Sequence, residues 1–142
     1  MRRFGREFMQ RPILIIEDDP DIVEALRYSL EAQRFETRIA ITGSEGLTAS
    51  LDKDRPPQLI LLDLLLPEMN GLEICRRLRK EPSTAGIPII MVTAKASEAD
   101  FLDAREAGVD DYITKPFSVR NVLERIGVLL AAAERRSDAG TL

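Results

Sequence analysis

The chain has 142 residues, the length of one typical domain, so we expect a single compact core. Hydrophobic residues make up 44% and charged residues 31% of the chain, a balance typical of a folded globular protein. The absence of histidine from the sequence excludes Ser-His-Asp and Cys-His catalysis, histidine-ligated zinc and a phosphohistidine on this chain. The single cysteine, Cys75, excludes an internal disulfide and favours a reducing compartment.

Charge and hydropathy limit the surroundings in which this chain works. The net charge of −4 argues against a general attraction to nucleic acid. No apolar run approaches the roughly 20 residues of a membrane-spanning helix, and the N-terminus lacks the apolar region of a secretory signal. We therefore expect a soluble intracellular protein. Residues 1–10 form a basic leader that we expect to be disordered. An alternative is a basic arm that contacts an acidic partner. Met9 is an alternative translation start.

Short apolar runs alternate along the chain with segments of helical spacing. We expect strands at 13–16, 35–40, 59–62, 89–92 and 112–114, and helices that begin near residues 20, 43, 71, 97 and 118. Asp19 and Pro20 suit the start of the first helix, and Gly108 suits the end of the fourth. We place the folded domain at residues 11–134, and a tail or the start of a linker at 135–142.

Alternating strands and helices predict an α/β fold with a parallel sheet, right-handed crossovers and helices on both faces. Such sheets bind ligands beyond the carboxyl ends of their strands. Four of the expected strands end in polar residues: Glu17, Asp18, Asp19, Asp63, Thr93 and Lys115. This set suits the Mg²⁺-dependent transfer of a phosphoryl group to a carboxylate, because Mg²⁺ prefers carboxylate oxygens and a carboxylate can form an acyl phosphate. A lysine and a hydroxyl can then hold the phosphoryl oxygens.

The acidic residues differ in how strongly they indicate such a site. Asp19 is better explained as a helix cap than as a ligand, and Glu17 and Asp18 on their own fit a cap as well as a metal site. Asp63 interrupts the apolar run of residues 59–66, where an unpaired charge would cost several kcal/mol. Asp63 therefore needs a cation or an ion-pair partner, which favours a functional role.

The remaining candidates are weaker on their own. Thr93 is an ordinary strand residue, Tyr112 is more simply explained by packing, and Cys75 occupies a core position of its helix. Lys115 precedes Pro116, and a cis peptide bond there would aim the amine.

Four segments together resemble the receiver domain of bacterial two-component response regulators. They read Ile-Ile-Glu-Asp-Asp-Pro at 15–20, Leu-Asp-Leu-Leu-Leu-Pro-Glu-Met-Asn-Gly at 62–71, Met-Val-Thr-Ala at 91–94 and Asp-Asp-Tyr-Ile-Thr-Lys-Pro-Phe at 110–117. The resemblance covers residues 11–134 in the family's order and spacing. It implies a single flavodoxin-like (βα)5 domain whose strands have the order 2-1-3-4-5.

The resemblance also implies a role for each residue at the sheet edge. Asp63 becomes the phosphoacceptor. Asp18 becomes a direct ligand of Mg²⁺, or of Mn²⁺ in its place, while Glu17 acts mainly through water. The backbone carbonyl of Leu65 becomes a further metal ligand. Leu65 and Lys95 occupy two variable positions that tune the lifetime of the phosphoryl group in this family.

The same resemblance implies how the signal leaves the site. Thr93 and Lys115 would contact the phosphoryl group, and Tyr112 would be an aromatic switch. The surface that changes would comprise the fourth helix, the fifth strand and the fifth helix. A sensor histidine kinase or a small phosphodonor would supply the phosphoryl group, and a downstream protein or output domain would receive the signal. The chain would act in the bacterial cytoplasm as a signalling domain, not a conventional enzyme, although it promotes its own phosphorylation and dephosphorylation.

The sequence most resembles the winged-helix transcriptional subgroup of response regulators. In that subgroup Asp111 and Arg125 would pair across a dimer. Phe101 and Asn121, however, stand where the subgroup usually has an oppositely charged pair. We therefore expect a monomer without phosphate and a weak homodimer with it, and no direct binding of this chain to nucleic acid or membrane.

Three other functions deserve comparison with the receiver. A degenerate receiver would bind partners without being phosphorylated, although the full set of site residues argues against it. A phosphatase of the haloacid dehalogenase type needs a second acid two residues after its nucleophile, where this chain has Leu65. A nucleotide-binding module needs a glycine-rich loop after the first strand, and none is present in the sequence.

Overall fold

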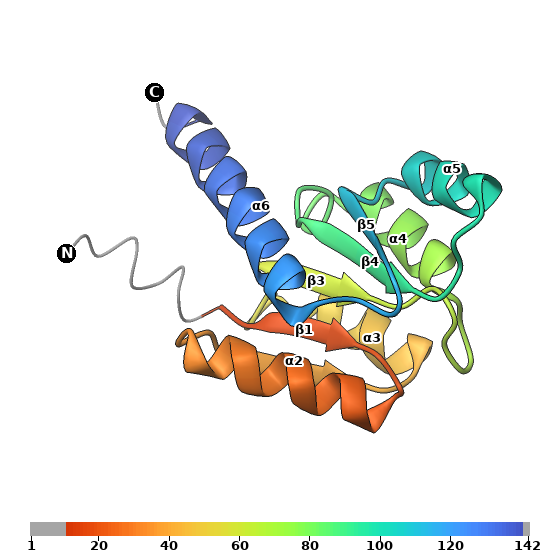
Figure 1. Ribbon diagram of the computed structural model, residues 1–142. Coiled ribbons are helices and arrows are strands. Elements are labelled where there is room, and N and C mark those ends of the chain that lie inside the picture. The colour runs from red at the N-terminus through yellow and green to blue at the C-terminus, as the bar shows by residue number, and fades with distance from the viewer. Residues whose placement is uncertain (1–10, 141–142) are drawn as a thin grey trace.

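The computed structural model describes residues 11–140, so the expected basic leader at 1–10 lies outside the described residues (Figure 1). Strands and helices alternate along the chain as predicted. They are β1 (Ile13–Ile16), α2 (Pro20–Ala32), β2 (Thr37–Ala40), α3 (Gly43–Ser50), β3 (Leu59–Leu62), α4 (Gly71–Lys80), β4 (Ile89–Thr93), α5 (Glu98–Ala107), β5 (Asp111–Thr114) and α6 (Val119–Gly140).

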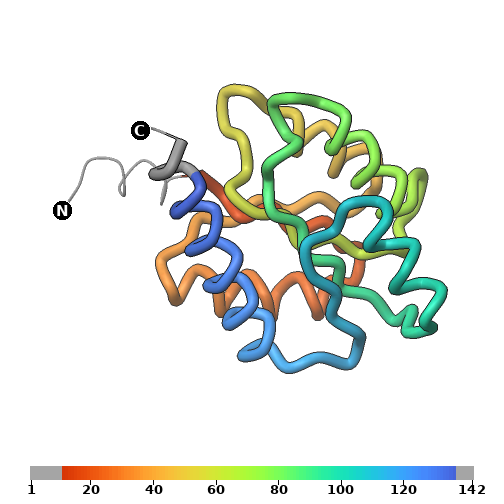
Figure 2. Tube along the Cα trace, turned by 90° about the horizontal axis from the view of Figure 1, so that it is seen from above, coloured from red at the N-terminus to blue at the C-terminus, as the bar shows by residue number. Residues whose placement is uncertain are grey.

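The five strands form one parallel sheet in the order β2-β1-β3-β4-β5, which confirms the predicted flavodoxin-like topology. Helices α2 and α6 cover one face, and α3, α4 and α5 cover the other (Figures 1 and 2). β1, β3 and β4 are buried along their whole length, because each lies inside the sheet with helices on both sides. Their carboxyl ends therefore meet at a single edge.

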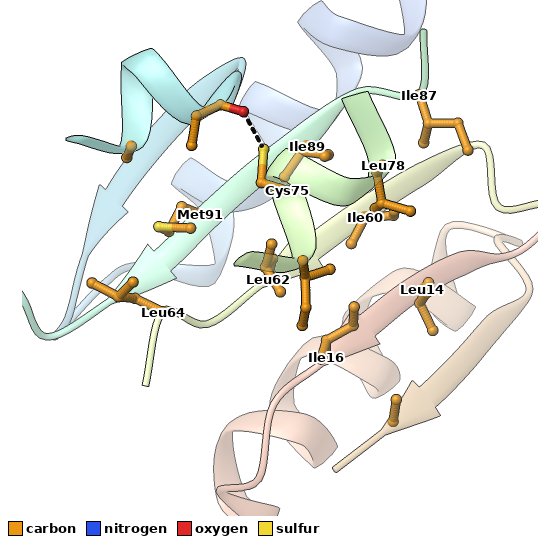
Figure 3. Close-up of a cluster of buried hydrophobic side chains, with 14 of the residues drawn as sticks. Leu14, Ile16, Ile60, Leu62, Leu64, Cys75, Leu78, Ile87, Ile89 and Met91 are labelled. Carbon is orange, nitrogen blue, oxygen red and sulfur yellow. Dashed lines mark hydrogen bonds between the residues drawn. The ribbon is translucent and has the colours of Figure 1, made fainter. Parts of the chain in front are cut away.

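The core consists of two apolar clusters, one on each face of the sheet. Figure 3 shows the cluster beneath α3, α4 and α5, which contains Cys75 as predicted. The thiol is fully buried and donates a hydrogen bond to the carbonyl oxygen of Ala107, at 3.2 Å. Burial raises the pKa of Cys75 to about 11, so the thiol stays protonated at neutral pH.

Local capping explains where two of the helices begin and end. The Asp19 carboxylate accepts a hydrogen bond from the backbone N–H of Asp21 at 2.9 Å, and Pro20 is the first residue of α2. Gly108 ends α5 in the left-handed conformation with φ of 104°, which a residue with a side chain rarely adopts. Both capping predictions are confirmed.

Two boundaries differ from the sequence prediction by more than one residue. β2 begins at Thr37 rather than at Phe35, because the N–H of Phe35 still bonds to the carbonyl of Leu30 at the end of α2. α6 continues to Gly140, so residues 135–140 are helical where we expected a tail or linker. The domain boundary at residue 134 itself stays a prediction. Within residues 11–140, no helix combines the length and apolar character needed to span a bilayer.

Candidate functional site

The structure brings the polar residues predicted from the sequence together at the carboxyl edge of the sheet. Glu17 and Asp18 follow β1, Asp63 follows β3, Thr93 ends β4 and Lys115 follows β5. β1, β3, β4 and β5 are consecutive in the sheet, which is why residues so far apart in the chain meet. The arrangement places acidic, hydroxyl and amine groups within one small region.

Three carboxylates form the centre of this region. Glu17, Asp18 and Asp63 each offer an oxygen that lies within 4.8 Å of the other two. Glu17 is only 3% exposed and Asp63 only 6%, whereas Asp18 reaches the solvent. Burying several carboxylates so close together is unfavourable unless cations neutralise them. Hard oxygen ligands of this kind are those that Mg²⁺ and Mn²⁺ bind.

Lys115 supplies the positive charge that the sequence predicted for Asp63. Its Nζ lies 2.7 Å from Oε1 of Glu17 and 3.1 Å from Oδ2 of Asp63. The Lys115–Pro116 peptide bond is cis, as the sequence analysis considered. Burial alone would lower the pKa of Lys115, but hydrogen bonds and charges from the two carboxylates outweigh burial and raise the pKa overall. Burial and the Asp63 charge raise the pKa of Glu17, despite its hydrogen bond to Lys115.

Backbone N–H groups fix the remaining carboxylate oxygens. Oδ1 of Asp63 accepts a hydrogen bond from the N–H of Leu65 at 3.1 Å. Oε2 of Glu17 accepts one from the N–H of Asp19 at 3.2 Å. The Leu65 side chain is 52% exposed above this loop. Both buried carboxylates are therefore held at two oxygens each, which gives the site a defined geometry.

A chain of hydrogen bonds leads from the site to the surface. The buried Thr93 hydroxyl accepts from the N–H of Lys95 at 3.3 Å, and the carbonyl of Lys95 accepts from the Tyr112 hydroxyl at 2.6 Å. The Tyr112 ring contacts Phe101 edge to face, with ring centroids 5.7 Å apart. The contribution of Lys95 could not be predicted, because a backbone carbonyl leaves no signal in residue type. The contact of Phe101 with Tyr112 depends on the packing of α5 against β5, which residue spacing does not show.

Asp111 and Arg125 lie together within the single chain. Nη1 of Arg125 is 3.1 Å from Oδ2 of Asp111, joining β5 to α6 at the surface. The family resemblance implies that this pair forms across a dimer, and that pairing stays a prediction. A dimer that used it would have to break the pair seen within each chain.

An apolar groove of about 560 Å³ adjoins the site. It lies between the N-terminal half of α2 and the segment that links β5 to α6, and Lys115 stands in its wall. Its apolar lining is Ile22, Ala25, Ala94, Pro116, Phe117 and Val119. Lys115, which contacts Glu17 and Asp63, is the residue that the groove and the site share.

Comparison with known proteins shows which family the chain belongs to. The sequence pattern of the response regulator receiver domain matches residues 13–127, which span nearly the whole sheet and its helices. The chain belongs to this family. Receiver domains are signalling domains that interact with histidine kinases, and they bind Mg²⁺ at an acidic cluster such as Glu17, Asp18 and Asp63.

The curated relatives of the chain include DNA-binding and transcriptional response regulators. The chain is 40% identical over 126 residues to the DNA-binding response regulator MtrA of Mycolicibacterium smegmatis, covering 89% of this chain and 53% of MtrA. It is 38% identical to the phosphate regulon transcriptional regulatory protein PhoB of Rhizobium meliloti, and the match covers 86% of this chain and 53% of PhoB. It therefore spans about half the length of these relatives. A CheY-like receiver domain protein of Methanospirillum hungatei superimposes with a TM-score of 0.82 at 35% identity, covering 89% of this chain and 98% of that one.

Proposed function

We propose that this receiver domain accepts a phosphoryl group on Asp63 and transmits the change to the surface formed by α5, β5 and α6. One observation carries the proposal: Asp63 is buried, bonded to Lys115 at 3.1 Å, and within 4.8 Å of two further carboxylates. A buried acid with this surrounding is suited to hold a cation and to attack a phosphorus atom.

The charges of the site fit a divalent cation. Three carboxylates face one amine, which leaves two negative charges, the charge that one Mg²⁺ would neutralise. Asp18, Asp63 and the Leu65 carbonyl would hold the ion directly. Glu17 would act mainly through water, as the resemblance to receiver domains implies, and its two oxygens accept from Lys115 and from the Asp19 N–H. Bound Mg²⁺, or Mn²⁺ in its place, would neutralise the oxygens of the incoming phosphoryl group.

The proposed reaction takes its phosphoryl group from another molecule, since this chain contains no histidine. An oxygen of Asp63 attacks the phosphorus of a phosphohistidine on a sensor kinase. The P–N bond breaks, and its electron pair remains on the imidazole nitrogen. The product is an acyl phosphate with nearly two negative charges and three acceptor oxygens. Acetyl phosphate would serve as a small donor through the same attack, with acetate as the leaving group.

The groove beside Lys115 supports a kinase as the partner. Its apolar walls lead to Lys115, whose amine touches Asp63. A helix that carries a phosphohistidine could pack its apolar face there and bring the phosphorus to Asp63. The hydrogen-bonding groups around Asp63 would then act on a phosphoryl group shielded from water.

Thr93 and Lys115 would couple the phosphoryl group to the surface. The Thr93 hydroxyl and the Lys115 amine would each donate to a phosphoryl oxygen, at about 1.5–3 kcal/mol for a charge-assisted bond. Reversing a 1:99 conformational balance requires about 5.5 kcal/mol, so two or three such bonds suffice. A shift of Thr93 reaches Tyr112 through Lys95, because both residues bond to the Lys95 backbone.

The relatives support a role in transcriptional regulation, because both are regulators of about twice this length. We infer that this chain is the receiver portion of such a regulator, or a receiver that signals to a separate partner, in the bacterial cytoplasm. It would not contact nucleic acid itself, in line with its net charge of −4. It would be monomeric without phosphate, because Asp111 and Arg125 pair within the chain, and weakly dimeric with it.

The test is intact mass after incubation with acetyl phosphate and Mg²⁺. Mass is the practical readout because the chain has no tryptophan for fluorescence. We expect one added phosphoryl group that disappears in Asp63→Ala and in the absence of Mg²⁺. The proposal would be contradicted if wild type binds Mg²⁺ but is modified neither by acetyl phosphate nor by a panel of histidine kinases. That result would favour a receiver that binds partners without phosphorylation.

A further inference from the structure

The loop between β3 and α4 carries both Asp63 and Leu65, and its middle is held from outside the site. One end is fixed where the N–H of Asp63 bonds to the carbonyl of Ile16, at 3.0 Å. The other end is fixed where the N–H of Gly71 bonds to the carbonyl of Leu64, at 2.9 Å. Residues 65–69 lie between these points. Leu66 and Met69 pack against the apolar core, and one further contact comes from another element.

The first residue of α3 provides that contact. The N–H of Gly43 donates to the carbonyl oxygen of Pro67 at 2.9 Å, and the N–H of Met69 donates to the same oxygen at 2.8 Å. Among the residues that the structure describes, Gly43 makes the only backbone hydrogen bond from another element to residues 65–69. The start of α3 therefore holds the loop at Pro67, in addition to the packing of Leu66 and Met69 against the core.

Gly43 can approach the loop only because it has no side chain. A Cβ atom at this position would lie 2.1 Å from the carbonyl oxygen of Met69 and 2.6 Å from its Cβ, far inside contact distance. One of these atoms is backbone and the other is attached to it directly, so the loop or the start of α3 would have to shift. Gly86 offers the contrast, because a Cβ there would meet nothing within 4 Å.

The loop also contains a strained residue beside this contact. Glu68 has φ of 72°, in the left-handed region that residues with side chains rarely adopt. The Glu68 side chain is exposed, so its left-handed backbone conformation is not explained by packing of the side chain. Such strain persists where the surroundings enforce it, and it gathers near functional sites. The hydrogen bond from the Met69 N–H to the Pro67 carbonyl spans Glu68, and Gly43 donates to the same carbonyl oxygen.

We propose that Gly43 is a positioning residue for the metal and phosphoacceptor loop, although it lies outside the site and 20 residues before Asp63. Its close packing fixes the loop at a height above the sheet from which the Leu65 carbonyl and the Asp63 carboxylate would bind the same cation. This inference rests on the proposed function. Residues that orient metal ligands in this way typically change metal affinity roughly 10–100-fold when they are replaced.

The first test compares Gly43→Ala with Gly86→Ala by isothermal titration with Mg²⁺. We expect Gly86→Ala to match wild type and Gly43→Ala to bind Mg²⁺ at least about tenfold more weakly, with a stoichiometry near one. Irreversible misfolding would lower the stoichiometry of binding and leave the Kd of the folded fraction unchanged. Reversible unfolding would raise the apparent Kd, so urea unfolding first establishes that both variants are folded under the titration conditions. A wild-type Kd in folded Gly43→Ala would overturn the inference.

The second test does not require that Gly43→Ala folds. Glu68→Gly and Glu68→Ala remove the same carboxylate, but only glycine frees the backbone at this position. We expect Glu68→Gly to bind Mg²⁺ about two- to fivefold more tightly than Glu68→Ala, because only glycine adopts a φ of 72° without strain. Equal Kd values for these two variants would overturn the inference. If wild type neither binds Mg²⁺ nor takes up a phosphoryl group from acetyl phosphate, the proposed function itself fails. If wild type does both and the variants have the wild-type Kd, only the inference about Gly43 fails.

Discussion

Replacing Lys115 by methionine should destabilise the fold in the absence of divalent cations. The Lys115 amine lies 2.7 Å from Glu17 and 3.1 Å from Asp63, and both carboxylates are almost fully buried. Methionine keeps much of the side-chain volume but leaves two carboxylates facing each other without a cation. Breaking a buried pair in this way costs about 3–5 kcal/mol. We expect about 3 kcal/mol, the lower end, because Lys115 retains some contact with water.

Urea unfolding followed by far-ultraviolet circular dichroism measures this effect, with chelator and then with Mg²⁺. A cation bound to the folded state at 100 times its Kd adds about 2.7 kcal/mol, and the variant should gain more than wild type because the ion replaces the lost charge. The exposed Lys53→Met is the matched control and should change the unfolding free energy by less than about 0.5 kcal/mol. A loss below about 1 kcal/mol in chelator, or a loss that Mg²⁺ leaves untouched, would refute the reasoning.

Three further predictions concern the switch, the groove and the core. Thr93→Ala should leave phosphorylation of Asp63 largely intact but weaken the change in amide exchange over α5 and β5, and equal responses in both proteins would contradict this. Ala25→Arg fills the groove, so it should slow transfer from a kinase at least about tenfold and leave the acetyl phosphate rate unchanged; equal slowing with both donors would argue against a docking role. Burial raises the pKa of Cys75 to about 11, so the thiol loses its proton at lower pH in the unfolded chain than in the folded one. The unfolding free energy should therefore fall by up to about 3 kcal/mol between pH 9 and 11. Urea unfolding of Cys75→Ala over the same pH range should show a smaller fall.

The sequence was sufficient to predict the sheet and its functional edge, because both leave signals in residue type. Continuous apolar runs indicated central parallel strands, and the structure has β1, β3 and β4 buried throughout. Asp63 stood out as an acid within such a run, and its need for a cation pointed to a partner before any geometry was known. The structure supplies that partner as Lys115. The metal and phosphoacceptor roles of these residues remain predictions.

Contacts made by backbone atoms could not be predicted in the same way. The carbonyls of Lys95 and Pro67 accept the hydrogen bonds that join Tyr112 and Gly43 to the site region, and any residue type has such a carbonyl. Gly43 is one of eight glycines, and only its distance from Met69 distinguishes it. The late end of α6 escaped prediction for another reason, since small and charged residues favour a helix without marking where it stops.

The two residues proposed to hold the phosphoryl group are joined through their backbones. β4 and β5 are neighbours in the sheet, and the N–H of Lys115 donates to the carbonyl of Thr93 at 2.8 Å. Phosphorylation would replace the single charge of Asp63 with nearly two, so the Lys115 amine would leave the carboxylates for the phosphoryl oxygens. A movement of either residue would be felt by the other through this bond. The response would therefore begin at adjacent strand ends, and Tyr112, which lies on β5 and bonds to the segment after β4, is placed to report it at the surface.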